Sequence, residues 1–142
     1  MRNDKKIFLD INVVIDFLER SRPQHNSSVK LIEYLTLNNY EICISEDMLT
    51  TIYYISKEKV SVLNFLYFIT EQWNILHFGK ETIQRAVAMS LENKQDLEDQ
   101  LQCLCAQAAT CCCLITHDKT FYDCGITIFT AKEFLKEKIE QT

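Results

Sequence analysis

The sequence predicts a three-layer α/β/α sandwich, an α/β fold in which helices cover both faces of a central parallel sheet of about five strands. Short apolar runs of strand length alternate with longer stretches that have apolar residues at helical spacing. Of the 142 residues 47% are hydrophobic, which is enough for a buried core. Only 2 glycines and 1 proline are present, far fewer than a turn-rich β-sandwich needs. At this length we expect one domain over residues 1–142.

The strands are predicted from continuous apolar runs and from alternation of apolar and polar residues. Ile7, Phe8 and Leu9 form the first such run, and the second strand combines alternation with residues of high β-propensity. In chain order, the predicted strands are Lys5–Asp10, Tyr40–Ile44, Trp73–Phe78, Cys111–Thr116 and Ile126–Phe129.

Helices are predicted between the strands and after the last one. Pro23 ends the first helix, and Ser45, Asp96 and Thr130 are residues of the type that caps a helix N-terminus. The predicted helices begin after Asp10, near Asn26 or Ser27, after Ser45, at Ser61, at Thr82, at Asp96 and after Thr130.

Glycine content and charge exclude several classes of function. Gly79 and Gly125 lie far apart, so neither a P-loop nor a GxGxxG dinucleotide turn can form. The formal net charge of −5 does not favour a broad basic surface for duplex phosphates, although an acidic metal cluster would itself contribute to that charge. Because no apolar stretch could cross a bilayer and the N-terminus is a poor signal peptide, we expect a cytoplasmic protein without membrane contact.

The 7 cysteines are expected to be free thiols. Five of them fall within Cys103–Cys113, and three are adjacent, which is awkward for a disulfide framework. A zinc site is the alternative, but structural zinc sites use spacings such as CxxC on turns. We therefore expect buried cysteines that act as small apolar side chains in a reducing compartment.

Carboxylates follow two of the predicted strands and open one helix. Asp10 ends the first strand, Asp118 follows the fourth, and the acidic run from Asp96 to Asp99 opens the helix that leads into the fourth. Ligand sites in parallel sheets form at the carboxyl ends of the strands. Carboxylates gathered there would repel one another, and Mg²⁺ or Mn²⁺ would relieve that repulsion. The chemistry indicated is metal-assisted hydrolysis of a phosphate ester.

Simpler structural roles stand beside this hypothesis. Asp96 alone is better explained as an N-cap, Asp99 is open between the two roles, and Asp118 could begin a turn. Asp16 is expected to be a solvated helix residue, and His117 an exposed histidine at a strand end.

Three segments of the chain carry characteristic acidic motifs: Ile7–Asp16 with its Asp-x-Asn, Asp96–Gln102, and Leu114–Phe121. Together they resemble the motifs of PIN domains. The similarity covers nearly the whole chain, and the motifs stand in the family's order. The resemblance implies a Mg²⁺- or Mn²⁺-dependent ribonuclease, as in the toxins of bacterial VapBC toxin–antitoxin pairs. It also implies RNA as substrate, an antitoxin protein as partner, and a homodimer.

Motif by motif, the resemblance assigns roles in the site. Asp10, Asp99 and Asp118 would be the catalytic metal ligands, and Asn12 would shape the site. Thr116 would hydrogen-bond a ligand carboxylate or a metal-bound water, and Asp96 would be an accessory acid.

The second motif departs from the family pattern. Where these toxins usually place a glutamate on the helix after the second strand, this chain has Thr51. Glu46 and Asp47 could compensate, but both lie about a helical turn earlier. The alternative is therefore a catalytically weakened or inactive PIN-type domain that binds nucleic acid or protein. A haloacid-dehalogenase-type phosphatase is disfavoured because Asn12 stands where that chemistry needs an acid.

Overall fold

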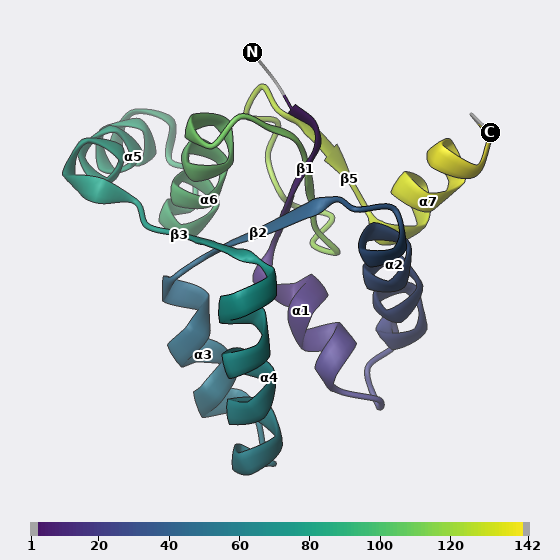
Figure 1. The fold of residues 1–142 in the computed structure, drawn as a ribbon. Coiled ribbons are helices and arrows are strands. Elements are labelled where there is room, and N and C mark those ends of the chain that lie inside the picture. The colour runs from purple at the N-terminus through teal and green to yellow at the C-terminus, as the bar shows by residue number, and fades with distance from the viewer. Residues whose placement is uncertain (1–2, 141–142) are drawn as a thin grey trace.

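A computed structural model describes residues 3–140 and contains one five-stranded parallel sheet, with strand order β3-β2-β1-β4-β5. Figure 1 shows the sheet with helices packed around it. The strands are β1 (Asn3–Leu9), β2 (Glu41–Ser45), β3 (Asn74–Leu76), β4 (Cys111–Ile115) and β5 (Thr127–Phe129). The helices are α1 (Ile11–Leu18), α2 (His25–Leu37), α3 (Asp47–Ile55), α4 (Lys59–Gln72), α5 (Gly79–Asn93), α6 (Leu97–Ala108) and α7 (Ala131–Glu140).

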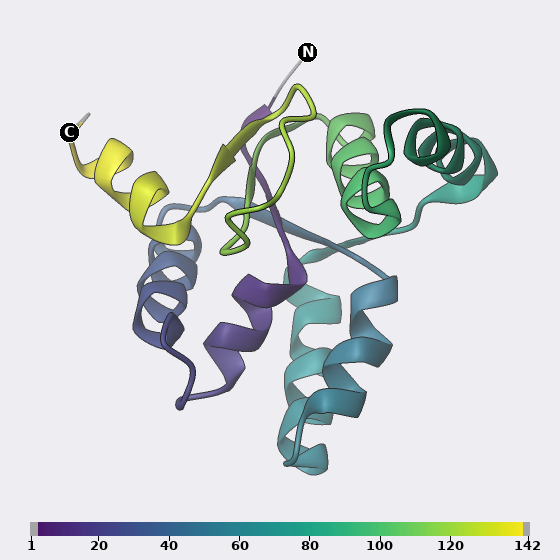
Figure 2. The same cartoon turned by 180° about the vertical axis from the view of Figure 1, so that it is seen from behind.

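The helices lie on both sides of the sheet, which confirms the predicted α/β/α sandwich. Helix α6 contacts β2 and β4, and α5 packs on α6. Helices α2 and α7 contact each other on the opposite side of β1, as both views show (Figures 1 and 2). Helices α1 and α3 continue directly from the ends of β1 and β2.

The core is built from the central strands, whose apolar runs the sequence predicts. Ile7, Phe8 and Leu9 of β1 are fully buried, as are Leu114 and Ile115 of β4. Burial on both faces explains why these strands read as continuous apolar runs rather than alternating ones. At about 1.5–3 kcal/mol for each large apolar side chain removed from water, these residues hold the strand ends in place.

The order of the strands places a topological switch between β1 and β4. From β1 the chain moves outward through β2 and β3, and then returns to the other side of β1 for β4 and β5. Leu9 pairs with Ile115, and the Asp10 amide donates to the Ile115 carbonyl at 2.9 Å. The residues that follow these two strands therefore begin side by side, where parallel sheets bind ligands.

Most element boundaries differ from the predicted ones by one to three residues, and one predicted cap is wrong. Ser45 is not an N-cap: it remains in β2, paired with Leu76, and its Oγ is buried without a hydrogen-bond partner among residues 3–140. The pairing of β2 with β3 thus extends the strand over the residue expected to start the helix. Thr130 does cap α7, accepting the Glu133 amide at 3.1 Å in a reciprocal capping box.

The expectation of free cysteines is wrong for two residues. Cys103 on α6 and Cys124 in the β4–β5 loop form a disulfide, because the loop folds back over α6. The free thiols of Cys43, Cys105, Cys111 and Cys113 are buried, and that of Cys112 is half-buried. None of them takes part in a metal-binding cluster within residues 3–140.

In the described part of the chain, no helix is both long enough and apolar enough to cross a membrane.

Candidate metal and phosphodiester site

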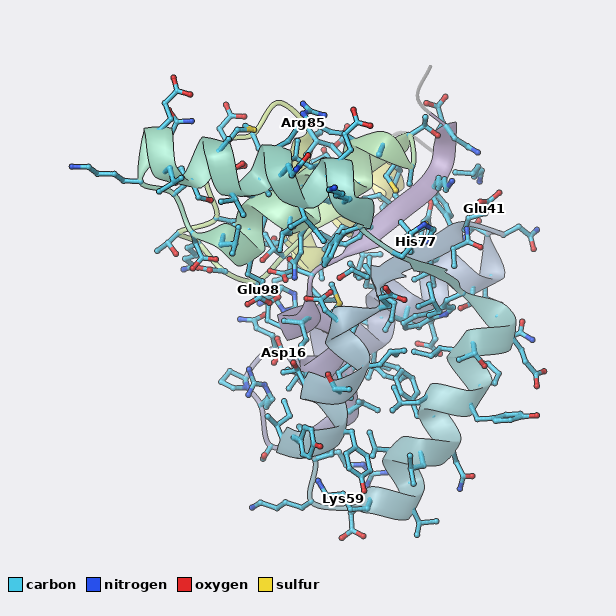
Figure 3. The ribbon with its side chains drawn as sticks, turned by 90° about the vertical axis from the view of Figure 1, so that its left-hand side faces the viewer. Asp16, Glu41, Lys59, His77, Arg85 and Glu98 are labelled. Carbon is cyan, nitrogen blue, oxygen red and sulfur yellow. A yellow bond between two sulfur atoms is a disulfide. The ribbon has the colours of Figure 1, made fainter. Side chains whose placement is uncertain are left out.

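An acidic pocket of about 300 Å³ opens at the carboxyl ends of β1 and β4. It lies where the start of α1, the start of α6 and the loop after β4 meet, and Figure 3 labels Glu98 on α6 and Asp16 on α1 at this side of the molecule. The lining residues are Asp10, Ile11, Asn12, Asp96, Glu98, Asp99, Asp118 and Thr120. Five of these eight carry a carboxyl group, although three separate segments of the chain supply them.

Asp10 is the most buried carboxylate of the pocket, and each of its two oxygens accepts a hydrogen bond. It is 5% exposed, and it caps α1 by accepting the Ile11 amide at 2.7 Å through Oδ1. Its other oxygen, Oδ2, accepts from the Thr116 hydroxyl at 2.8 Å. Burial is the largest influence on this carboxyl and raises its pKa, with the Asp118 charge adding to the increase. Asp10 therefore favours a positive charge beside it.

Asn12 and Thr116 connect the two strand ends. The Asn12 amide nitrogen donates to Asp10 Oδ2 at 3.1 Å and to Thr116 Oγ1 at 3.2 Å. Thr116 Oγ1 also accepts the backbone amide of Asp118 at 3.0 Å. This network aligns the Asp10 carboxylate with the backbone that carries Asp118. Thr116 lies behind the pocket rather than in its lining.

The first turn of α6 concentrates negative charge. Asp96 is the N-cap, accepting the Asp99 amide at 3.1 Å. Burial and the neighbouring charge of Asp96, followed by Asp10, raise the pKa of Asp99 to about 6. Burial, and then Asp10, likewise raise the pKa of Glu98. Asp10 and Asp99 therefore act on each other across the pocket.

Asp118 lies on the open side of the pocket. Its Oδ1 accepts from the Thr120 hydroxyl at 2.7 Å and from the Thr120 amide at 2.9 Å, and these bonds lower the pKa of Asp118. Asp118 thus stays ionised beside Asp10 and Asp99, whose pKa values are raised.

The donor set fits a hard divalent cation. Carboxylate oxygens are the ligands that Mg²⁺ and Mn²⁺ prefer, and a cation would relieve the mutual repulsion of Asp10 and Asp99. Within residues 3–140, no three acidic, histidine or cysteine side chains close around one point tightly enough to hold an ion by themselves. Mg²⁺ usually keeps several of its waters and binds through one or two carboxylates plus substrate phosphates.

Thr51 does not line this pocket. It is exposed on α3, and Glu46 and Asp47 at the start of that helix are also exposed and outside the lining. Asp47 is nevertheless close enough to Glu98 for its charge to raise the pKa of that carboxyl.

Two sequence expectations near the site are wrong. Asp16 is not solvated: it is 3% exposed and accepts hydrogen bonds from Arg22 Nε and from His117 Nδ1. His117 is not an exposed histidine, because its side chain is only 7% exposed and packs against α1. The helical pattern placed Asp16 correctly on α1, but the sequence could not show that the β4–β5 loop covers it.

Sequence reasoning also missed Gln102. This residue is fully buried on α6, and its amide nitrogen donates to Glu98 Oε1 at 3.3 Å and also hydrogen-bonds the Asp10 carboxyl, lowering its pKa. A glutamine in the apolar stripe of a helix, one turn after two acids, is the signal that could have identified it.

Comparisons with known proteins agree with this geometry. Residues 6–120 match the PIN domain family. The chain is 34% identical over 136 residues to "Ribonuclease VapC1" of Aquifex aeolicus, and the match covers 93% of this chain and 94% of that protein.

Similar solved structures include two from toxin–antitoxin complexes. A toxin–antitoxin complex from Klebsiella pneumoniae matches with a TM-score of 0.66 and 19% identity, covering 88% of this chain and 97% of the other. VapC20 of Mycobacterium tuberculosis, described as a toxin that cleaves the sarcin–ricin loop, matches with a TM-score of 0.67 and 11% identity, covering 85% of this chain and 96% of the other. VapBC2 of Rickettsia felis, bound to promoter DNA, matches with a TM-score of 0.64 and 16% identity, covering 88% of this chain and 98% of the other. At these identities, the three similar structures establish the fold alone. The match to the PIN domain family covers most of the chain, and the chain therefore belongs to that family.

Proposed function

We propose that this PIN domain is a metal-dependent endoribonuclease that hydrolyses RNA phosphodiester bonds as the toxin of a toxin–antitoxin pair. The observation that carries the proposal is the convergence of Asp10, Asp99 and Asp118 on one pocket at the switch between β1 and β4. The similarity to a VapC ribonuclease over nearly the full length of both chains supports the same activity.

The residues of the pocket would have different roles, which depend on where each one lies. Asp10, Asp99 and Asp118 would hold Mg²⁺ or Mn²⁺, with Asp96 as an accessory acid that also fixes the helix start. A divalent cation held by these residues would lower the pKa of a coordinated water and would offset charge on the phosphodiester. Asn12 and Thr116 both donate hydrogen bonds to the Asp10 carboxylate and so keep it in one orientation.

Removing one carboxylate charge tests the proposal. We expect Asp10→Asn or Asp118→Asn to reduce Mn²⁺-stimulated RNA cleavage by about a hundredfold or more, because each removes a ligand charge at the reacting centre. Cleavage is measured on a labelled RNA pool, with circular dichroism to check folding. Asp123→Asn, an exposed acid outside the pocket, is the matched control. Variants that cleave as fast as the wild-type protein would overturn the proposal.

The threonine of the second motif gives a separate prediction. Thr51 lies one turn after Asp47 on α3, on the face whose charge reaches Glu98. We expect Thr51→Glu to lower the Mn²⁺ concentration for half-maximal cleavage by about threefold to tenfold, since one added carboxylate contributes roughly a kcal/mol. Thr70→Glu adds the same charge at an exposed threonine of α4, outside the pocket, and is the control. Equal effects of both variants, or none, would show that the missing glutamate does not limit the site.

The outer surface of α3 and α4 is suited to an antitoxin. Six large apolar side chains are exposed on this helix pair, and a cluster of this kind is typical of a protein–protein interaction site. They are Tyr54, Ile55, Val60, Leu63, Tyr67 and Phe68. We propose that an apolar segment of an antitoxin covers them. Charged substitutions at Tyr67 and Phe68 should then abolish co-purification with a co-expressed antitoxin and leave cleavage by the isolated protein intact.

We further propose a cytoplasmic homodimer. Helix α5 buries only Ala86 and exposes Ile83, Val87 and Leu91 at helical spacing, a stripe that a second copy would cover. Light scattering of the wild-type protein and of Val87→Glu tests this, with a dimer expected for the first and a monomer for the second.

A further inference from the structure

We propose that Asp16 and His117 form a positioning pair that holds the segment after β4 against α1 and so fixes Asp118 opposite Asp10. The inference rests on the proposed ribonuclease function and adds two residues to it. Neither residue lines the acidic pocket, so neither touches a substrate or metal bound there.

The contact between the two side chains is buried and specific. Asp16 Oδ2 lies 2.6 Å from His117 Nδ1, and the two side chains are 5% and 7% exposed. A carboxylate only accepts hydrogen bonds, so the proton of this bond lies on Nδ1. Arg22 Nε donates to the other oxygen, Oδ1. Each partner is therefore costly to leave unpaired, which makes the contact a strong constraint.

Helix α1 also forms a second hydrogen bond with His117, through the backbone. Asn12 Oδ1 accepts the backbone amide of His117 at 2.9 Å. Asn12 and Asp16 are four residues apart, so they lie on one face of α1. The backbone and the side chain of His117 are both fixed to that face, one residue before Asp118.

Asp118 depends on this hold because its own carboxylate bonds are local. They run to Thr120, two residues further along the same exposed loop. Such bonds shape the loop but cannot set its distance from Asp10. That distance is set through Thr116 and, by this proposal, through the His117 side chain.

Of the two His117 ring nitrogens, only Nδ1 makes a hydrogen bond in the described part of the chain. His117 Nε2 is buried and makes no hydrogen bond within residues 3–140. Substitution of His117 by asparagine or by glutamine distinguishes the roles of the two nitrogens. Asparagine would place its NH₂ group near the position of Nδ1, whereas glutamine would reach toward the position of Nε2. A positioning role through Asp16 predicts that asparagine replaces His117 and glutamine does not.

The experiment compares His117→Asn, His117→Gln and His117→Ala in the full chain. We expect the alanine and glutamine variants to lose about tenfold to a hundredfold in kcat, the cost of misplacing a reacting group by about 1 Å, with a raised half-saturating Mn²⁺ concentration. Their KM for RNA should change by less than about twofold, since no substrate contact is lost. His117→Asn should keep wild-type values. Ser28→Ala, which removes a buried hydrogen bond to the Val13 carbonyl on α1, controls for general destabilisation and should keep wild-type kinetics.

Hydrogen exchange separates this inference from the proposed function. Amide exchange at Asp118 and Thr120 should accelerate in His117→Ala and stay slow in His117→Asn, whether or not the protein cleaves RNA. Wild-type exchange and cleavage in His117→Ala would overturn the positioning role while the ribonuclease stands. Rescue by glutamine but not by asparagine would overturn it as well, because Nε2 would then be the acting atom. A wild-type protein without cleavage, but with the expected exchange pattern, would instead remove the ribonuclease function.

Discussion

Asp99 is the carboxylate whose surroundings oppose its charge most clearly. Burial and the nearby acids raise its folded-state pKa from 3.8 to about 6, so the folded protein binds a proton more tightly than the unfolded chain. Its ionisation therefore costs stability at pH above about 6, and that cost disappears as the pH falls through 6 toward 3.8.

Asp99→Asn should stabilise the metal-free protein at pH 7.5. Two pKa units correspond to about 2.7 kcal/mol, but Asp99 is only half-buried, and screening by solvent reduces the expected gain to about 1 kcal/mol. Urea unfolding at several pH values measures it. The gain should shrink as the pH falls from 6 to 4. A variant less stable than the wild-type protein at pH 7.5, without metal, would show that the repulsion is relieved within the protein.

At the scale of elements, the disulfide joins two parts of the site. Cys103 lies on α6, which begins with the acidic run, and Cys124 lies in the β4–β5 loop that also carries Asp118. The bond closes a loop of 21 residues, so its loss should cost about 2–4 kcal/mol.

Thermal unfolding with and without a reductant tests this. We expect reduction to lower the Tm of the wild-type protein, and we expect Cys124→Ser to have a low Tm that reductant no longer changes. Cys112→Ser, at a half-buried free thiol, is the control. A wild-type Tm that is insensitive to reduction would contradict the prediction.

The elements were predictable to the extent that each one's residues determine it locally. Apolar runs located β1 and β4 because both faces of these strands are buried, and Asp96 and Thr130 marked helix starts because capping is a local interaction. Ser45, Asp16 and Cys103 were misassigned because their partners, Leu76, His117 and Cys124, come from distant segments. Sequence placed Asp10 and Asp118 at strand ends, but only the fold shows which strands are neighbours.

For the molecule as a whole, the pocket binds metal ions only if its charges stay close together. Addition of Mn²⁺ at about a hundred times its Kd should stabilise the folded protein by about 2.7 kcal/mol. A thermal shift measured at pH 7.5 should therefore rise with Mn²⁺ concentration. It should shrink at pH 5, because protons then compete for Asp10 and Asp99, whose pKa values are raised. A shift of equal size at both pH values would place the metal elsewhere.

Calorimetry of Mn²⁺ binding is the most direct test of the claim that distant carboxylates form one metal site. The wild-type protein is predicted to bind Mn²⁺ below millimolar concentration. Asp10→Asn and Asp118→Asn should each weaken that binding about tenfold or more, although the two residues lie on different segments. If the wild-type protein shows no binding heat at millimolar Mn²⁺, or if both variants bind as the wild type does, the account of a shared metal site is contradicted.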